Sequence, residues 1–288
     1  MRAFAYERPT SLTDALALLA DPSADARLLA GGTDLIIRIR DGSMRPGTVV
    51  DVKRIGELER GIRDDGEHLS IGARTTMTDV MRDDRIASDY EALADGAAVV
   101  GSVQIRNRAT LAGNICNASP AADTVPALLV FGARVVAVGR EGRRTIPLDD
   151  LFIRSGVTML QADELVEAIE LPKPSVARGS VHVRRTRRRG HDLASVTLAC
   201  AVDANGVTRI AYGSVGPRPV LVVDESGLLA DASADHTQKL ARVDELLVDA
   251  APSPTSMRAS PEYRLAMLRV LGLRAVTTAI ERLGARAR

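Results

Sequence analysis

Apolar positions in the first part of the chain alternate between the spacing of helices and the spacing of strands. Residues 12–19 repeat apolar side chains at helical intervals, and Thr10 or Ser11 directly before them can cap the helix. Residues 26–29 form a short apolar run that ends at paired glycines, and residues 35–41 return to helical spacing. The pattern predicts a helix, a strand, a glycine turn and a second helix, in that order.

The alternation continues up to the segment "LPKP" at 171–174. It predicts strands at 48–53, 68–73 and 133–138, and helices at 91–100 and 123–131. The two prolines of "LPKP" interrupt both helical and strand hydrogen bonding. We therefore expect one domain of mixed helices and strands over residues 1–173 and a second domain over residues 174–288.

Beyond this boundary, three segments with strand spacing follow one another closely. They cover residues 180–187, 194–203 and 207–216, and "DANG" at 203–206 has the residues of a hairpin turn. The tail has helical spacing at 237–248 and 261–283. We expect an α+β fold whose C-terminal part is a three-stranded antiparallel sheet with helices packed on it.

Composition and charge exclude several classes of protein. The 288 residues are 45% hydrophobic and 26% charged, which is typical of a globular chain, and the formal net charge of +1 gives no general attraction for nucleic acid. No apolar run is long enough to span a membrane, and the first twenty residues lack the ordered regions of a signal peptide. A cytoplasmic protein is the expectation.

The sequence offers no internal metal centre. Cys116 and Cys200 lie far apart and outside any CxxC pattern, so neither a zinc site nor a cysteine-held iron-sulfur cluster is expected. The four histidines also lack the spacing of metal ligands. Any redox centre would then be an organic cofactor or would belong to another chain.

Two polar segments rich in small residues interrupt the apolar pattern. They are "AGGTDL" at 30–35 and "TLAGNICNASPAAD" at 110–123, and the second shows neither helical nor strand period, so it is interpreted as a loop. Glycine lets consecutive amides converge on one anion, and a following helix start adds partial positive charge. Side chains suited to the hydroxyl and phosphate groups of a dinucleotide accompany them at Thr33, Thr110, Asn114, Ser119 and Asp123.

The residues alone leave two interpretations of these segments open. Neither segment has the GxGxxG spacing of a Rossmann fold or the GxxxxGK[ST] spacing of a P-loop. Both segments could be phosphate cradles. Equally, Gly31 and Gly32 could form a plain tight turn, and residues 110–123 an ordinary surface loop.

Longer stretches around both glycine segments carry a family resemblance. "RLLAGGTDLIIRIRDG", "VGSVQIRNRATLAGNICNASPAADTVPALLVFGARVV" and "RRTRRRGHDLASV" resemble the FAD-binding medium subunit of molybdenum hydroxylases, a family that includes carbon monoxide dehydrogenase and bacterial xanthine dehydrogenase. The resemblance extends over nearly the whole chain. It implies an FAD-binding fold of the vanillyl-alcohol oxidase/MurB type with two subdomains, followed by the C-terminal domain.

The resemblance also implies a function and partners. A large subunit would oxidise the substrate at a molybdopterin cofactor, and a small subunit with two [2Fe-2S] clusters would carry electrons to FAD in this chain. The expected assembly is a dimer of heterotrimers, without nucleic acid. This chain would pass electrons to an external acceptor and would contain neither a catalytic residue nor a metal ligand of its own.

The FAD-binding positions of the family can be placed on this sequence. The first motif and its approach fall on Arg27, Leu28, Leu29, Ala30, Gly31, Gly32, Thr33, Asp34 and Leu35. The second falls on Thr110, Ala112, Gly113, Asn114, Ser119 and Asp123, with Val100 before it. Ala112 replaces a glycine that relatives often have. Arg184 replaces a lysine near the flavin, and Asp192 and Leu193 match a pair beside the isoalloxazine where some relatives have tyrosine in place of the leucine.

Two other functions and one other ligand class compete with this interpretation. The arginine-rich run 184–189 resembles a nucleic-acid patch, but only seven aromatic residues occur in the whole chain, so no stacking platform accompanies it. The run is instead a candidate for contact with a partner subunit or the cofactor, or it is a plain solvated face. Together with Arg106 and Arg108 it is a candidate for the charged part of a partner interface. The alternative functions are a self-sufficient flavin oxidase or dehydrogenase, and a scaffold subunit that has lost FAD.

Overall fold

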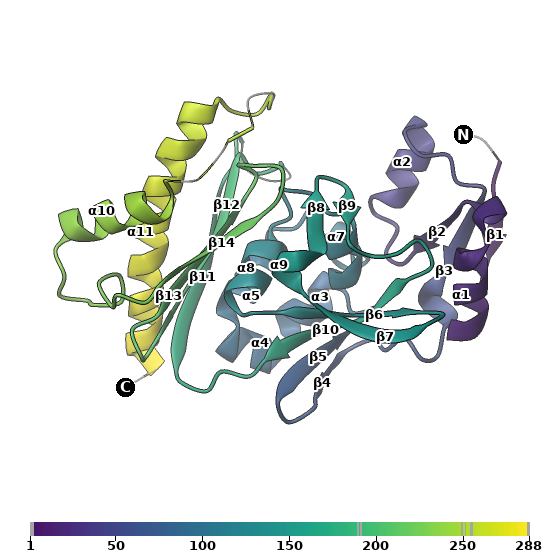
Figure 1. Ribbon diagram of the computed structural model, residues 1–288, viewed down its shortest axis with the longest axis horizontal. Helices are drawn as coiled ribbons and strands as arrows, with labels where there is room; N and C mark the ends of the chain where they lie inside the picture. The colour runs from purple at the N-terminus through teal and green to yellow at the C-terminus, as the bar shows by residue number, and fades with distance from the viewer. Residues whose placement is uncertain are drawn as a thin grey trace.

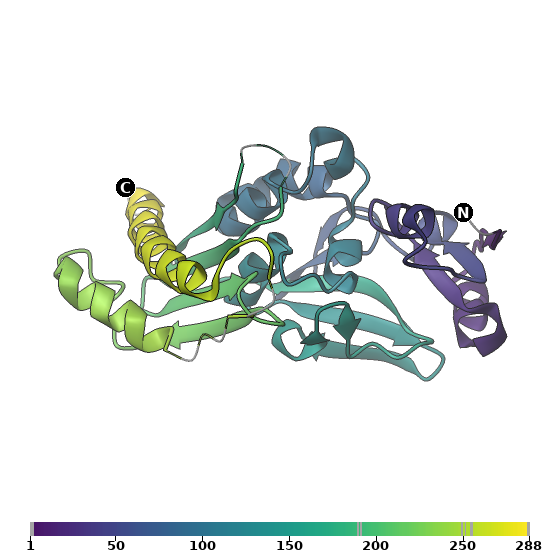
Figure 2. The same ribbon diagram turned by 90° about the horizontal axis from the view of Figure 1, so that it is seen from above.

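Three of the four β-sheets formed by the described residues follow one another along the long axis of the molecule. The computed structural model describes residues 3–286 except 189, 191, 249, 251, 254 and 255. A small parallel sheet lies at the N-terminal end, an antiparallel sheet in the middle, and a second antiparallel sheet with the longest helix at the other end (Figure 1). The view from above in Figure 2 shows the same succession. The structure therefore has the expected mixture of helices and sheets.

The N-terminal sheet carries the first glycine segment at its edge. Its strand order is β1-β3-β2, and both pairings are parallel. The elements are β1 (Ala5–Glu7), α1 (Leu12–Ala20), η1 (Pro22–Ala24), β2 (Ala26–Leu29), α2 (Leu35–Asp41), β3 (Thr48–Asp51) and η2 (Val52–Arg54). Ser11 caps α1 by accepting a hydrogen bond from the backbone N–H of Asp14. The predicted order of helix, strand, glycine turn and helix is confirmed.

The middle sheet has the strand order β4-β5-β10-β6-β7 and is antiparallel throughout. Its strands are β4 (Ile62–Asp64), β5 (His68–Gly72), β6 (Arg134–Gly139), β7 (Gly142–Pro147) and β10 (Leu165–Pro172). Helices α3 (Met77–Arg82), α4 (Asp84–Asp89), α5 (Glu91–Ala98), α6 (Val103–Arg106), α7 (Leu111–Cys116) and α8 (Thr124–Val130) lie between β5 and β6 in sequence. Helix α9 (Leu148–Leu151) and the hairpin β8 (Phe152–Arg154) and β9 (Val157–Thr158) complete this part.

The interpretation of residues 110–123 as one continuous loop is wrong in its first half. Residues Leu111–Cys116 form α7, and the side chain of Thr110 caps it by accepting a hydrogen bond from the backbone N–H of Gly113 at 3.1 Å. Leu111 and Ile115, four residues apart, are both fully buried. Two apolar anchors among small residues are enough to dock one short helix.

The C-terminal sheet has four strands, so the predicted number of three is wrong. Its order is β11 (Arg178–Arg185), β12 (Val196–Asp203), β13 (Thr208–Gly213) and β14 (Val220–Asp224), all antiparallel. The strand that was missed follows Pro217 and Pro219, which mask the pattern because proline usually ends a strand. The predicted hairpin at 203–206 is confirmed, since Gly206 N–H donates to the Asp203 carbonyl at 3.0 Å.

Both faces of this sheet are covered by helices. Leu198 and Cys200 of β12 belong to the apolar cluster that includes α11 (Pro261–Arg286), whereas Ala199 and Ala201 belong to the cluster of the middle part of the chain. Helices α5 and α8 contact the sheet on that second face, and α10 (His236–Leu246) packs against α11. Among the described residues, no helix is both long and apolar enough to cross a membrane.

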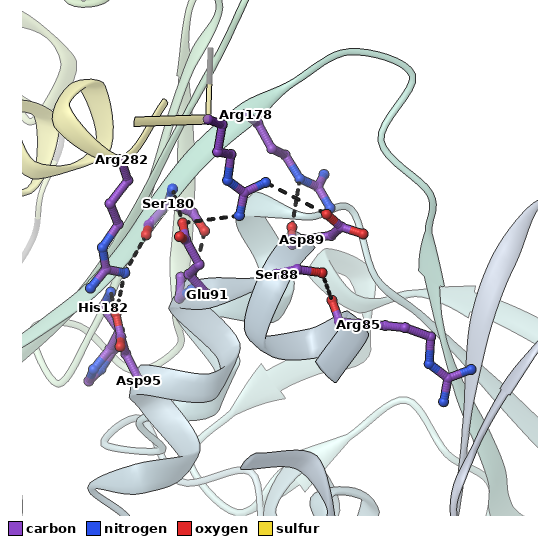
Figure 3. A network of polar contacts seen from close by, with 11 residues as sticks. Arg85, Ser88, Asp89, Glu91, Asp95, Arg178, Ser180, His182 and Arg282 are labelled. Atoms are coloured by element: carbon purple, nitrogen blue, oxygen red, sulfur yellow. Dashed lines mark hydrogen bonds and ion pairs between the residues drawn. The ribbon is translucent and has the colours of Figure 1, made fainter. Parts of the chain in front are cut away.

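A polar network joins α5, β11 and α11 (Figure 3). Arg282 of α11 donates hydrogen bonds to the Asp95 carboxylate at 2.7 Å and to the Ser180 carbonyl at 2.6 Å. The Ser180 hydroxyl accepts from the backbone N–H of Ala92 at the start of α5. These contacts fix the C-terminal sheet against α5, which packs on α8, the helix that follows the second glycine segment.

Gly179 allows β11 and α11 to approach this closely. A Cβ at this position would overlap the Ala279 carbonyl oxygen and the Leu283 amide nitrogen, both in the backbone of α11. Backbone atoms cannot rotate away as a side chain can, so any larger residue must separate the strand from the helix.

We expect the substitution Gly179→Ala to lower the free energy of unfolding by about 1–3 kcal/mol, because the added methyl group overpacks the interface. Gly284→Ala is the matched control, since a Cβ at Gly284 meets nothing within 4 Å. That substitution should leave stability unchanged or raise it by up to about 1 kcal/mol through helix propensity. Urea unfolding followed by circular dichroism measures both, and equal midpoints would contradict the packing argument.

Candidate functional site

The two glycine segments meet in the folded chain although about eighty residues separate them in sequence. A Cβ on Gly31 would overlap the carbonyl oxygen of Arg108 and lie 2.8 Å from its carbonyl carbon. The second segment is held in place by an isolated bridge between Thr76 and Thr110, with the Leu111 N–H donating to the Thr75 carbonyl at 3.1 Å. Close backbone contact therefore requires glycine at position 31.

The first segment forms a turn between β2 and α2 that only glycine accommodates without strain. Gly32 has φ +78°, and the N–H of Ile36 donates to its carbonyl at 3.1 Å as α2 begins. Asp34 precedes the helix and makes no side-chain capping bond. The turn thus has the left-handed glycine that a nest of converging amides needs.

A cleft of about 260 Å³ opens where the two segments meet. It is lined by Ala30, Gly31, Lys53, Arg60, Arg74, Thr76, Asn107, Arg108 and Thr110. The first glycine segment and α7's cap therefore share one cleft. Ala30, Gly31 and Thr110 were predicted site residues, and Arg108, predicted for a partner interface, lines the cleft with them. Lys53, Arg60 and Arg74 were not predicted, because they come from separate elements without a local motif.

The cleft has an excess of positive charge. Lys53 is paired with Asp51 at 2.7 Å and Arg60 with Asp79 at 2.9 Å. Arg74 donates hydrogen bonds to the carbonyls of Lys53 and Ile55, and its Nε has no partner among the described residues. Among the same residues, Arg108 has no acidic side chain within 4 Å. Two uncompensated guanidinium groups beside a glycine nest favour an anionic ligand.

Helix α7 holds the second segment in a defined position. Asn114 accepts a hydrogen bond from the Thr124 hydroxyl at 2.7 Å, which ties α7 to α8. Ala112 is buried in the first turn of α7 with helical backbone, so the replacement of the family's glycine causes no strain. Gly113 is exposed, and a Cβ there would lie 2.8 Å from the capping oxygen of Thr110.

The turn after α7 makes a second connection to the first segment. Arg38 of α2 donates a hydrogen bond to the side-chain oxygen of Asn117 at 2.6 Å. Ala118 has φ +46°, and the Ser119 hydroxyl accepts from the backbone N–H of Ala121 at 3.2 Å. Ser119 therefore stabilises its own turn, and one of its lone pairs is already used.

Asp123 ends the second segment at a buried polar cluster with the C-terminal sheet. Its carboxylate accepts hydrogen bonds from Arg184 Nη1 at 2.7 Å and from the Thr197 hydroxyl at 3.0 Å. His182 Nε2 lies 2.7 Å from the same Thr197 oxygen. Asp123 and Arg184, both expected near the flavin, are brought together. Thr197 and His182 were missed because nothing in the sequence marks a threonine or histidine of a buried strand as special.

Burial changes the protonation behaviour of this cluster. It raises the pKa of the Asp123 carboxyl to about 6, against the opposing effects of the Arg184 charge and the Thr197 hydrogen bond. Burial, with a smaller contribution from the positive charge of Arg184, lowers the pKa of His182 to about 3. At neutral pH the cluster therefore contains a carboxylate, a guanidinium and a neutral imidazole.

The other predicted residues lie in several environments. Arg27 is paired with Asp25 at 3.0 Å, and the partly buried Leu28 packs against the core beside it. Leu29 lies at the end of β2, while Thr33 and Leu35 flank Asp34 at the start of α2. Val100 packs against the apolar cluster of the middle part, and its carbonyl accepts from Arg106 Nη1 at 3.1 Å.

Asp192 and Leu193 lie in the connection between β11 and β12. Asp192 accepts hydrogen bonds from the backbone N–H and the guanidinium of Arg187 at 3.2 and 3.4 Å. Leu193 is 53% exposed. Arg189, the last residue of the arginine-rich run, lies outside the described residues.

Comparisons with protein-family models cover most of the chain. Residues 2–174 match the FAD binding domain in molybdopterin dehydrogenase. Residues 181–279 match the C-terminal domain of the CO dehydrogenase flavoprotein.

Individual relatives match over nearly their whole length. The chain is 32% identical over 286 residues to the xanthine dehydrogenase FAD-binding subunit of Escherichia coli O157:H7, covering 97% of each chain. It is 31% identical to the carbon monoxide dehydrogenase medium chain of Hydrogenophaga pseudoflava, covering 96% of each. Among solved structures, reconstituted CO dehydrogenase from Oligotropha carboxidovorans matches with a TM-score of 0.89 and 30% identity, over 98% of this chain and 99% of that chain.

We expect His182→Gln to protect the fold against mild acid. Because the pKa of His182 is lowered in the folded state, its contribution to stability is full above the unfolded pKa of about 6.5 and decreases as the pH falls from there towards 3. The free energy of unfolding of the variant relative to wild type should rise by about 1.4 kcal/mol per pH unit below pH 6.5.

Urea unfolding of both proteins between pH 7 and pH 5 measures this difference. The comparison with wild type also removes the opposing contribution of Asp123, whose raised pKa favours the folded state at low pH. His236→Gln on the exposed N-terminal turn of α10 is the control for the substitution itself. A difference between His182→Gln and wild type that does not vary with pH would contradict the assignment of a buried neutral imidazole.

Proposed function

We propose that this chain, which belongs to the family of FAD-binding subunits of molybdopterin dehydrogenases, accepts electrons from the [2Fe-2S] clusters of a partner subunit and passes them to an external acceptor. It is thus a flavoprotein subunit of an oxidoreductase, and FAD is its cofactor. Bound FAD supplies the two-electron redox chemistry, whereas the protein binds, orients and shields it.

One observation carries the proposal: two glycine segments far apart in sequence line a single cationic cleft. The left-handed turn at Gly32 and the close backbone approach at Gly31 place Ala30 and Gly31 in the lining of this cleft. The uncompensated guanidinium of Arg108 and that of Arg74 would neutralise phosphate charge. The cleft volume of about 260 Å³ is small for a whole dinucleotide, so we infer that it takes the part with the pyrophosphate.

The backbone of the first motif would hold the pyrophosphate, and the second motif the sugar chain. On this proposal, residues 27–35 supply the contacts of the first motif. The exposed face of α7 supplies those of the second motif, with Asn114 on the helix and Ser119 and Asp123 after it. Val100, Asp192 and Leu193 remain predicted contacts. We propose that residues 1–173 bind FAD and that residues 174–288 contribute Arg184 to the same site.

The partners are inferred from the relatives. Carbon monoxide dehydrogenase medium chains match this chain over nearly its whole length. We infer that it assembles with a large molybdopterin-binding subunit and a small [2Fe-2S] subunit. The dimer of heterotrimers and the cytoplasmic location stay predictions. The use of Arg106, Arg108 and the run 184–189 at an interface also stays a prediction. Substrate oxidation would take place in the large subunit.

We expect Gly32→Ala to bind FAD at least about tenfold more weakly, because the left-handed turn must distort and misalign its amides. Gly132→Ala is the matched control, since Gly132 has φ +67° in open space. Both variants put a Cβ on a left-handed backbone, and at position 32 the Cβ must in addition displace the Leu29 side chain, whose Cδ1 would lie 2.7 Å away. Calorimetric titration of the flavin-free chain with FAD compares them, and equal affinities in both would remove the first segment from the site.

We also expect the isolated chain to leave the physiological substrate unoxidised, whereas dithionite should reduce its flavin. Its two cysteines, Cys116 and Cys200, are free and come from separate elements, so electrons must enter from a partner. Anaerobic bleaching of the flavin by purines, aldehydes, N-heterocycles or carbon monoxide tests the chain alone and co-expressed with its partners. Bleaching of the lone chain at the rate of the assembly would favour a self-sufficient flavin oxidase.

A further inference from the structure

We propose that Thr197 and His182 of the C-terminal sheet are positioning residues that hold the Asp123 carboxylate in the orientation in which it binds FAD. This inference rests on the proposed function and extends it. On this inference, part of the affinity for FAD comes from hydrogen-bonded side chains that lie outside both glycine segments. Neither residue belongs to the motifs that suggested the site.

The geometry of the sheet places the three side chains on one face. Arg184 of β11 pairs directly with Thr197 of β12, and His182 pairs with Ala199, so His182 and Thr197 are diagonal neighbours. Side chains two residues apart on a strand point to the same side. That side is the one on which α8 packs, with Asp123 immediately before its first residue.

The hydrogen bonds form an ordered chain. Thr197 has a single proton, and it donates that proton to Asp123 Oδ1 at 3.0 Å. The Thr197 oxygen, 2.7 Å from His182 Nε2, must then accept from an Nε2–H group. Neutral His182 therefore orients the Thr197 hydroxyl. Thr197 uses one lone pair of Asp123 Oδ1, and Arg184 uses one lone pair of Asp123 Oδ2. The remaining lone pairs of Asp123 stay in a fixed direction.

Among the described residues, the side chain of Asp123 has no hydrogen-bond donor other than Arg184 and Thr197. It lies at the N-cap of α8 but makes no side-chain capping bond, and its side chain is only 9% exposed. Without Thr197 the carboxylate would keep only the Arg184 contact and could rotate about it. The charged and titratable groups that face the Asp123 carboxylate are Arg184 and His182 of β11. Asp95, which is paired with Arg282, accepts a hydrogen bond from the backbone N–H of His182.

The hydrogen bonds from His182 through Thr197 to Asp123 can be tested by their effect on the pH dependence of FAD binding. Protonation of Asp123 would end its charged contact, so FAD affinity should fall as the pH decreases through about 6. The Thr197 hydrogen bond stabilises the charged carboxylate, so its removal should move this midpoint to higher pH. A residue that only packs in the core would not shift the midpoint.

The experiment measures FAD dissociation constants of the full-length, flavin-free chain by calorimetry between pH 5 and pH 8. Thr197→Val should weaken binding about tenfold at pH 7 and raise the midpoint, and Thr197→Ser should restore both. His182→Leu should act in the same direction, while His182→Gln keeps a donor and should resemble wild type. Thr208→Val is the matched control, because Thr208 is fully buried in the same sheet and its hydroxyl has no partner among the described residues.

Each outcome decides between distinct conclusions. Weaker binding with a shifted midpoint in Thr197→Val or His182→Leu, but not in Thr208→Val, supports the proposal. Unchanged binding and midpoint in both site variants, or an equal loss in Thr208→Val, overturns it while FAD binding by the wild-type chain still stands. A wild-type chain that binds no FAD would overturn the proposed function, and this inference with it.

Discussion

A buried carboxylate needs compensating donors, and Asp123 obtains both of its donors from the C-terminal sheet. Removal from water disfavours the charged form so strongly that the pKa of Asp123 is raised even with Arg184 at 2.7 Å. The position of Asp123 at the end of the second glycine segment therefore depends on the packing of β11 and β12 against it. A second contact of this kind lies nearby: the guanidinium carbon of Arg178 of β11 lies 4.7 Å from the ring centroid of Tyr90 and 4.4 Å from that of Phe131.

Close backbone approaches complement these polar contacts. Gly31 lets the first segment touch the backbone at Arg108, and Gly179 lets β11 touch α11. At Gly213, a Cβ would lie 2.6 Å from the carbonyl oxygen of Pro120, so β13 packs directly against the turn after α7. These glycines join segments that are distant in sequence. Their small size is thus a requirement of the tertiary structure.

Strongly periodic elements were predictable from the sequence, and elements with a local irregularity were not. The apolar run of β12 was recognised because both of its faces are buried. Strand β10 was missed because a register shift between Val166 and Ala168 breaks its alternation. Within the site, Gly31 and Thr110 could be predicted from local composition. Arg74 and Thr197 could not, because their roles arise only when strands pair and bring them beside residues far away in the chain.

The division of the site between distant segments has a physical consequence for cofactor binding. The cationic cleft uses backbone geometry that is fixed by the N-terminal and middle sheets, whereas Asp123 depends on charge balance supplied by the C-terminal sheet. A ligand that contacts both must bridge them, so its binding free energy also stabilises their relative position. On the proposed function, a flavin held in this way would be kept at a fixed distance from a partner's redox centre, as electron transfer requires.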